Sequence, residues 1–436
     1  MLDVLKDGSK KAAARLETLE SRAEDSARVE PVVADILRSV RRDGDAALVR
    51  LTKKFDGVSL DRRSLIVGKR DLERAEKQVP AATRTALRTA YRRITRFHKH
   101  QCERGFEISE DGLRLGMRVT PLARAGVYVP GGSAAYPSSV LMNIVPARVA
   151  GVDDITVVTP PSPDGIRPEV LFAARLAGAD RVVQVGGAQA VGALAYGTDS
   201  VERVDKIVGP GNVYVATAKR LVFGVVDIDM VAGPSEVLII ADDSADPRFV
   251  AADMLAQAEH DPLAAAICIA TSAQVAGRVV AEVERQLAEL ERRAIAEKSI
   301  ERFGTVLAVD SVERAAEIAD DIAPEHLELF VRRPRRLASR IRNAGAIFLG
   351  QYAAEALGDY AAGPNHVLPT GGAARFSSPL GVYDFVKRTS IIEATRAGFE
   401  RLAPTVERLA LSEGLEGHAR SVTRRLENGR SKRRKS

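Results

Sequence analysis

The chain has 436 residues, of which 45% are hydrophobic and 28% charged, with a formal net charge of +6. This composition is typical of a globular protein and excludes a disordered or collagen-like chain. At roughly 150 residues per domain, the length predicts about three structural units.

The positive charge is concentrated at the C-terminus. The last nine residues, 428–436, carry five basic side chains and no acidic one, which leaves a net charge of about +1 on the rest of the chain. A short basic end without aromatic residues is more typical of a solvated, disordered tail than of a nucleic-acid-binding arm. We therefore expect a disordered tail over 428–436 and no nucleic-acid binding.

Several features indicate a soluble cytoplasmic protein. Only two cysteines occur, Cys102 and Cys268, and they lie far apart in the sequence, which fits a reducing compartment. The N-terminus lacks the apolar core of a signal peptide, and no apolar run approaches the ~18 residues of a membrane span. We expect no membrane association.

The first ~120 residues have helical periodicity, with apolar side chains spaced through 31–57 and 72–100. From about residue 124, short β-branched runs alternate with alanine-rich helical stretches. The predicted strands are 125–130, 154–160, 181–187 and 205–210, followed by a second series at 236–242, 265–271, 305–310 and 345–350. Alternating strands and helices predict parallel sheets covered by helices, here in two α/β units. Residues 382–426 again have a helical pattern.

Polar clusters surround four of the six histidines. QAEH (257–260) places Gln257 and His260 on one helix face, where both could bind one ion, although these four residues alone fit an ordinary polar helix end better. Glu325 and His326 are adjacent, as in a proton shuttle or as in a surface pair before a strand. Asp359 and His366 lie in a glycine- and proline-rich loop, where Asp359 is either a hard metal ligand or a turn residue. Glu413 and His418 are five residues apart, and this spacing alone does not indicate a particular kind of site.

Three glycine-rich loops, 129–139, 185–193 and 209–216, each follow a predicted strand and precede a helix. Backbone N–H groups in such loops can bind phosphate, and three of them make a dinucleotide plausible, although simple strand–helix turns would have the same composition. There is no P-loop, no intact GxGxxG motif and no nucleophile elbow.

Longer stretches resemble histidinol dehydrogenase, in order and over about residues 32–424. They include VYVPGG, YPSSVLMN, GGAQAVGALAYGT, GPGNVYVATAK, IDMVAGPSEVLIIAD, DMLAQAEH, APEHLEL, GDYAAGPNHVLPT and SPLGVYDFVKR. The resemblance implies the oxidation of L-histidinol to L-histidine through L-histidinal, the last two steps of histidine biosynthesis, with Zn²⁺ and two NAD⁺.

The resemblance also implies residue roles. Zinc, one ion per subunit, would be held by Gln257, His260, Asp359 and His418, and would grip the substrate rather than drive hydride transfer. His326 would be the general base in both oxidations, and Glu325 would activate water. The residues expected to contact substrate are Ser235, Gln257, His260, Glu325, His326, Asp359, His366, Glu413 and His418, and those expected to contact NAD are Tyr128, Gln189 and Asn212.

The implied fold is α/β, with two Rossmann-like parallel-sheet units in a domain-swapped homodimer whose active sites are shared. We expect an N-terminal helical arm over 1–30 and a C-terminal helical segment over 381–427. Residues 31–127 plus 235–380 would form the first α/β domain, with the zinc and catalytic residues, and 128–234 the second, on the NAD side. The basic tail lies outside the family pattern.

Three alternatives remain. A related zinc–NAD enzyme would oxidise another polar alcohol, but should lack Glu325, His366 and Glu413. A zinc hydrolase using Glu325 or His326 as base would not bind NAD. A nucleic-acid binder would depend on the tail, and its binding would be salt-sensitive.

Overall fold

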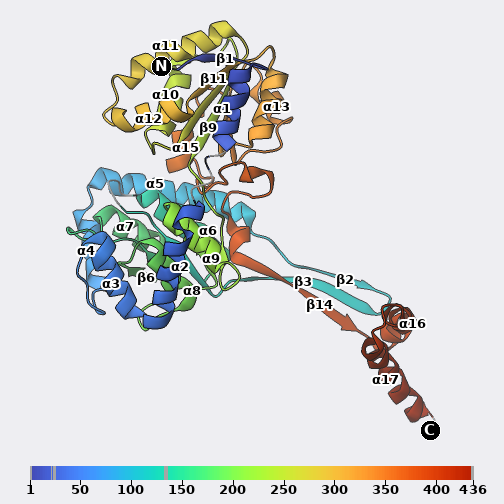
Figure 1. Cartoon of the computed structure of the whole chain (residues 1–436). Helices are drawn as coiled ribbons and strands as arrows, with labels where there is room; N and C mark the ends of the chain where they lie inside the picture. The colour runs from blue at the N-terminus through green and yellow to red at the C-terminus, as the bar shows by residue number, and fades with distance from the viewer. Residues whose placement is uncertain (1, 21, 23–25, 132–135, 434–436) are drawn as a thin grey trace. The chain divides into compact units, whose positions relative to one another are not determined.

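The computed structural model describes residues 2–20, 22, 26–131 and 136–433, and the chain divides into two compact units (Figure 1). The first comprises Met1–Cys102 and Leu122–Phe385, and the second Glu103–Pro121 and Val386–Ser436. Among the described residues, no helix is long and apolar enough to cross a membrane.

The first unit contains a five-stranded sheet in the order β6-β5-β4-β7-β8, with all neighbours parallel. Its central strands are buried on both faces, as the apolar runs predicted. The strands are β4 (Arg124–Tyr128), β5 (Asp154–Val158), β6 (Arg181–Val183), β7 (Lys206–Val208) and β8 (Asp227–Ile228). The connecting helices are α6 (Pro137–Ala150), α7 (Pro168–Ala177), α8 (Gly187–Tyr196) and α9 (Val213–Val222).

The N-terminal helices pack against helices of this five-stranded sheet. They are α2 (Ser26–Asp43), α3 (Asp45–Asp56), α4 (Lys69–Gln78) and α5 (Ala81–His98). Helix α2 contacts α8 and α9, α4 contacts α7, and α5 contacts α6. This differs from the expected grouping of 31–127 with 235–380, and the expected boundary before Tyr128 cuts through β4. Helical periodicity shows that a helix has a buried face, but not which sheet covers it.

A six-stranded parallel sheet, also in the first unit, has the order β1-β11-β10-β9-β12-β13. Its strands are β1 (Val4–Lys6), β9 (Glu236–Ala241), β10 (Ala265–Ala270), β11 (Thr305–Ala308), β12 (His326–Phe330) and β13 (Ala346–Leu349). Its helices are α1 (Lys10–Glu20), α10 (Pro247–Ala258), α11 (Ala273–Leu287), α12 (Arg293–Phe303), α13 (Val312–Ile322), α14 (Pro334–Ala338) and α15 (Glu355–Tyr360). The prediction of two parallel α/β sheets is confirmed.

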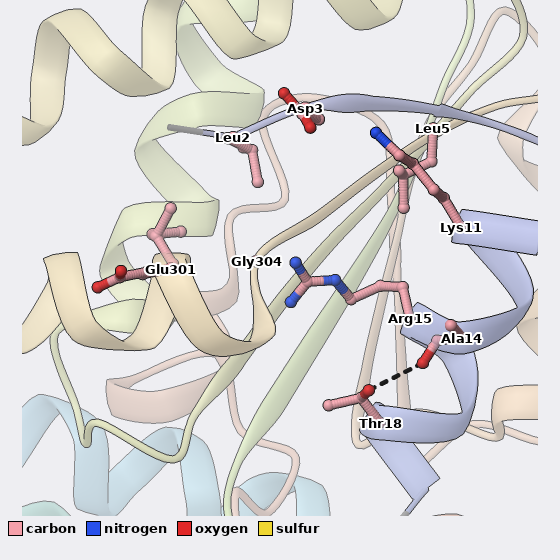
Figure 2. A pocket seen from close by; sticks show the side chains of 10 residues that line it. Leu2, Asp3, Leu5, Lys11, Ala14, Arg15, Thr18, Glu301 and Gly304 are labelled. Carbon is pink, nitrogen blue, oxygen red and sulfur yellow. Dashed lines mark hydrogen bonds between the residues drawn. The ribbon is translucent and has the colours of Figure 1, made fainter.

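The N-terminal arm is not wholly helical. Residues 4–6 form β1, which pairs with β11 at the edge of the six-stranded sheet (Figure 1). A hollow of about 430 Å³ lies between β1, α1 and the end of α12, and charged side chains of Asp3, Lys11, Arg15 and Glu301 line it (Figure 2). None of the predicted site residues reaches this hollow.

The second unit is an antiparallel sheet, β14-β3-β2, followed by two helices. Its elements are β2 (Phe106–Glu110), β3 (Leu113–Pro121), β14 (Val386–Ala394), α16 (Arg396–Ser412) and α17 (Glu416–Arg433). The purely helical prediction was wrong for 106–121 and 386–394. These strands are largely exposed and lack strict alternation, and β3 pairs with β14, which lies about 270 residues later in the chain.

The expected disordered tail is instead partly helical. Helix α17 continues through Arg433, and residues 434–436 lie outside the described part of the chain.

Candidate active site

The two adjacent residues Glu325 and His326 lie at the start of β12, at the amino edge of the six-stranded sheet. His326 pairs in register with Val237 of the parallel strand β9, so Glu236, which precedes Val237, lies beside both of them. The backbone N–H of Glu236 donates to Glu325 Oε2 (3.0 Å), and its carbonyl oxygen lies 3.2 Å from His326 Nδ1. One residue of β9 therefore orients both side chains.

This geometry fixes the tautomer of His326. A carbonyl oxygen can only accept, so Nδ1 carries a proton and Nε2 holds the free lone pair of the neutral ring. Nε2 is buried and has no hydrogen-bond partner among the described residues. The nearest ionisable group is Asp359, whose Oδ1 lies 3.7 Å away. In the neutral ring, Nε2 is therefore the nitrogen that can accept a proton from a bound molecule.

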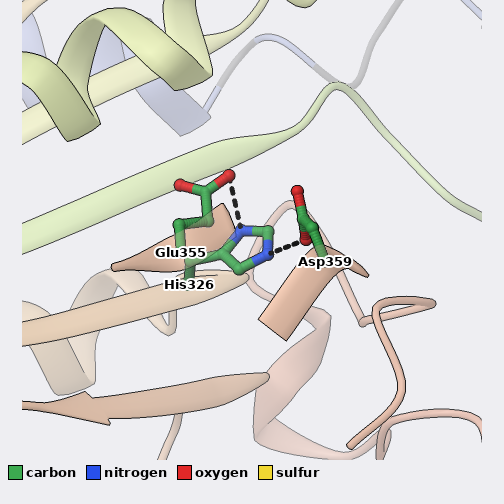
Figure 3. A group of neighbouring side chains, drawn as sticks. All are labelled: His326, Glu355 and Asp359. Carbon is green, nitrogen blue, oxygen red and sulfur yellow. Dashed lines mark ion pairs between the residues drawn. The ribbon is translucent and has the colours of Figure 1, made fainter. Parts of the chain in front are cut away.

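Carboxylates surround the imidazole. Figure 3 shows Glu355 on the Nδ1 side, at 4.0 Å, and Asp359 on the Nε2 side. Glu325 lies 3.8 Å from Nδ1. Burial lowers the pKa of His326, but Glu355, Glu325 and Asp359 together raise that pKa well above its usual value. The site therefore stabilises the imidazolium that proton transfer would create.

Burial disfavours the ionised form of two carboxyl groups in the site. It raises the pKa of Glu325 to about 7 and that of Glu355 to about 8. Burial also acts to raise the pKa of Asp359, but the nearby imidazoles, His326 first, hold it below its usual value. A bound cation would favour the ionised carboxylates and so lower these pKa values.

Gln257 and His260 come from the C-terminal end of α10. Gln257 is fully buried, and in the amide orientation that satisfies its neighbours, Nε2 donates to Glu355 Oε1 (2.6 Å) and Oε1 accepts from Glu236 N–H (3.1 Å). His260 is exposed, and its charge acts on Asp359 and His366. Ser235 is half-buried directly before β9. These residues therefore gather at the same amino edge as His326.

His366 connects this edge to helix α6 of the other sheet. Its Nδ1 lies 2.8 Å from the carbonyl oxygen of Asp359 and donates to it, so Nε2 accepts from the hydroxyl of Ser139 at 3.2 Å. Burial lowers the pKa of His366, in keeping with a neutral ring. Asn143, one turn further along α6, is fully buried and its Oδ1 has no partner among the described residues.

The predicted NAD residues lie at the carboxyl edge of the five-stranded sheet. The hydroxyl of Tyr128, the last residue of β4, accepts from Gly187 N–H (3.0 Å), and Gln189 is buried in the first turn of α8. Asn212 caps α9, where its Oδ1 accepts from the N–H groups of Tyr214 and Val215. Parallel α/β sheets commonly bind nucleotides at this edge. Residues 132–135 of the first glycine-rich loop lie outside the described residues.

Glu413 and His418 belong to the second unit. Glu413 is the residue directly after α16, His418 lies in the first turn of α17, and both side chains are exposed. Their participation in the site stays a prediction.

Sequence reasoning missed Glu355 and Glu236. Glu355 precedes Asp359 by four residues, so the two share a face of α15, and this spacing was a usable signal. His326, Glu355 and Asp359 could themselves hold a metal ion, since one ligand atom from each lies within 4.8 Å of the others. This group shares only Asp359 with the predicted zinc ligands.

The comparisons with known proteins are consistent over nearly the whole chain. The family model described as histidinol dehydrogenase matches residues 19–426. The chain is 54% identical to histidinol dehydrogenase of Aquifex aeolicus (94% of this chain, 95% of that one) and 52% identical to that of a Synechococcus strain (96% and 97%). The crystal structure of histidinol dehydrogenase from Elizabethkingia anophelis superposes with a TM-score of 0.91 at 35% identity, covering 98% of both chains.

The chain belongs to the histidinol dehydrogenase family. The predicted resemblance to histidinol dehydrogenase is confirmed, and so is the prediction that the chain is a dehydrogenase. The histidinol dehydrogenase from Elizabethkingia anophelis shares the α/β fold described above.

Proposed function

We propose that this protein converts L-histidinol into L-histidine through L-histidinal, with a zinc ion and two NAD⁺. The observation that carries this proposal is the buried His326, whose Nε2 has no hydrogen-bond partner among the described residues and whose ring lies within 4.0 Å of three carboxyl groups, in a chain of the histidinol dehydrogenase family. Each oxidation removes a hydride from the reacting carbon and a proton from the hydroxyl group on that carbon, and water supplies the second oxygen of the product carboxylate.

In the first oxidation, His326 Nε2 removes the hydroxyl proton of the substrate while a hydride leaves the carbon that bears this hydroxyl. The resulting imidazolium is stabilised by Glu355, Glu325 and Asp359. His326 must then release its proton before the second oxidation.

In the second oxidation, Glu325 takes a proton from the water that adds to the aldehyde. Its raised pKa, about 7, lets it accept and release a proton near neutral pH. His326 then removes a proton from the hydrated aldehyde as the second hydride departs.

Zinc fits the donor set that we propose: Gln257, His260, Asp359 and His418. An amide oxygen, a carboxylate and two neutral imidazoles are suitable ligands, and the Asp359 carboxyl, whose pKa is held below its usual value, offers a charged oxygen to a cation. When bound, zinc would supply a Lewis acid that grips the imidazole and amine of the substrate. The four zinc ligands would also contact the substrate. Ser235, His366 and Glu413 would provide its further contacts.

NAD⁺ would bind at the glycine-rich loops of the five-stranded sheet, against Tyr128, Gln189 and Asn212. When bound, it would accept the hydride. The Ser139–His366 hydrogen bond links helix α6, which follows the first of these loops, to the His326 site. This link supports the transfer of a hydride from a substrate at His326 to a cofactor on the five-stranded sheet.

We further propose a domain-swapped homodimer with shared active sites, in the cytoplasm. The second unit leaves many large apolar side chains exposed, a pattern that marks an interaction surface: Phe106, Ile108, Ile391, Ile392, Leu402, Val406, Leu409, Leu411 and Leu415. In such a dimer, Glu413 and His418 would come from the partner. Both cysteines are free, as expected for a reducing compartment.

Mixing two inactive variants tests the shared site. His326→Ala and His418→Ala homodimers should each be inactive, whereas heterodimers should regain one working site. If activity does not return after subunit exchange has been verified, the sites are not shared.

The proposed reaction is tested by incubating the purified protein with L-histidinol and NAD⁺. We expect two NADH for each L-histidine formed, loss of activity after chelation and its return with Zn²⁺. Other polar alcohols should give at least ten times less NADH. Absence of chelator-sensitive NADH would refute the proposal, and a better alcohol would identify the related enzyme instead.

A further inference from the structure

A buried ion pair lies behind the catalytic residues, between Arg22 and Glu236. Their side chains are only 5% and 2% exposed. Arg22 also donates to the carbonyl oxygens of Leu19 (3.1 Å) and Leu263 (3.3 Å), and its guanidinium lies 5.5 Å from the Phe303 ring centre. The second carboxylate oxygen of Glu236 accepts from Gly371 N–H (3.1 Å). The Glu236 carboxylate is therefore held by Arg22 and Gly371, and Arg22 is itself held by its other contacts.

The main chain of Glu236 is the part that touches the site. Its N–H donates to Glu325, its carbonyl oxygen accepts from His326, and its N–H also faces Gln257. Arg22 itself contacts none of these side chains in the interactions above. A change at Arg22 could reach Glu325 and His326 only through Glu236.

We infer that Arg22 is a positioning residue: by neutralising the buried Glu236 carboxylate, it fixes the backbone that orients Glu325 and holds His326 in its reactive tautomer. This role rests on the proposed function. It also assigns a part in the reaction to the N-terminal segment, which lies outside the motifs that indicated the family.

Without Arg22, the buried Glu236 carboxylate would keep one hydrogen-bond donor among the contacts described above, Gly371 N–H. An uncompensated buried charge costs more than the loss of the whole pair. The start of β9 would then shift or hydrate, and His326 Nδ1 would lose its fixed acceptor. A small misplacement of a general base reduces turnover strongly without abolishing substrate binding.

The test compares Arg22→Gln, Arg22→Lys and the double variant Arg22→Gln/Glu236→Gln in the full-length protein. We expect Arg22→Gln to lower kcat by roughly 10- to 100-fold, with KM for L-histidinol and zinc content changed less than threefold. Arg22→Lys should restore most of the activity because it retains the charge. The double variant should be more active than Arg22→Gln because no unpaired charge remains.

Arg15→Gln is the matched control. Arg15 comes from the same N-terminal segment and also donates to a backbone carbonyl, that of Arg302 (2.5 Å), but it lines the hollow of Figure 2 and does not approach the site. Its replacement should leave kcat unchanged. Thermal midpoints of all variants report any general loss of folding.

Two results would overturn the inference. One is a kcat of Arg22→Gln within threefold of the unmodified protein. The other is a loss of kcat that follows the thermal midpoint and is neither restored by lysine nor relieved in the double variant. Failure of the proposed function is distinct, because the unmodified protein would then produce no NADH from L-histidinol.

Discussion

The role of general base that we propose for His326 rests on the surroundings of its two ring nitrogens. Nδ1 is committed to a backbone carbonyl, while Nε2 is buried without a partner among the described residues and lies near Asp359. Buried imidazoles usually have both ring nitrogens hydrogen-bonded, whereas Nε2 of His326 has no such partner among the described residues.

Replacing His326 with glutamine should separate catalysis from metal binding. We expect kcat to fall about 10²- to 10⁴-fold with zinc content unchanged, because His326 is not among the proposed ligands. His100→Gln, at an exposed histidine outside the site, should have no effect. A loss of zinc that parallels the loss of activity would instead favour the ligand group His326, Glu355 and Asp359. Steady-state kinetics and metal analysis measure both quantities.

Asp253, which is half-buried, and Glu328, which is fully buried, form a hydrogen-bonded pair of acids next to α15. Glu328 Oε1 accepts from Glu355 N–H (2.9 Å), and burial raises the pKa of Glu328 and raises that of Asp253 to about 6. In the unfolded chain an aspartate ionises near pH 4. Between about pH 4 and pH 6 the folded state therefore binds more protons, and the free energy of unfolding falls as the pH rises.

Asp253→Asn should remove this loss of stability. Near pH 4 the variant and the unmodified protein should have similar thermal midpoints, whereas at pH 8 the variant should unfold roughly 2 °C higher. Asp164→Asn, at an exposed loop aspartate, provides the control and should not change the pH dependence. Equal midpoint differences at both pH values would contradict this explanation.

At the scale of elements, the parallel strands were predictable and the antiparallel ones were not. Runs such as 236–242 and 265–271 are apolar on both faces, which is distinctive of strands buried under helices. By contrast, β3 and β14 are partly exposed, and each is a strand chiefly because the other pairs with it. Pairing across about 270 residues leaves no local pattern.

The candidate site was predictable in composition but not in location. Histidines and acids stood out in the sequence, yet the proposed catalytic pair, Glu325 and His326, lies at the amino edge of its sheet, where ligands of parallel sheets are less often found. Glu236 escaped notice because it precedes an apolar strand and acts through its backbone. Backbone contacts are independent of residue type and therefore invisible in the sequence.

The loop after β7 is an element on which cofactor binding should depend. Gly209 has φ of +111°, and a Cβ there would lie 2.1 Å from the carbonyl oxygen of Tyr128. Gly209→Ala should therefore destabilise the fold by about 1–3 kcal/mol and weaken NAD⁺ binding, as measured by thermal unfolding and calorimetry.

Gly277→Ala is the matched control for that substitution. Gly277 lies within α11 and a Cβ there meets nothing within 4 Å, so alanine should stabilise the helix by up to about 1 kcal/mol. If both variants behave alike, backbone strain at Gly209 does not explain the effect.

Across the whole molecule, the residues that supply most of the net charge are separate in the sequence from the residues of the proposed active site. The basic C-terminus supplies most of the net charge, and it lies beyond the family match, which ends at residue 426. A chain ending at Glu427 should retain kcat and KM within about twofold. Loss of activity on truncation would assign a catalytic or assembly role to these residues.

The proposed zinc ligands belong to both units of the chain: His418 is in the second unit, and Gln257, His260 and Asp359 are in the first. Anomalous scattering at the zinc edge from crystals of the zinc-loaded protein locates the ion and its ligands directly. We expect one zinc per subunit, bound by Gln257, His260 and Asp359 of one chain and His418 of its partner, with His326 nearby but not coordinated. An ion bound instead by His326, Glu355 and Asp359, or a site to which no second chain contributes, would contradict the proposed zinc site.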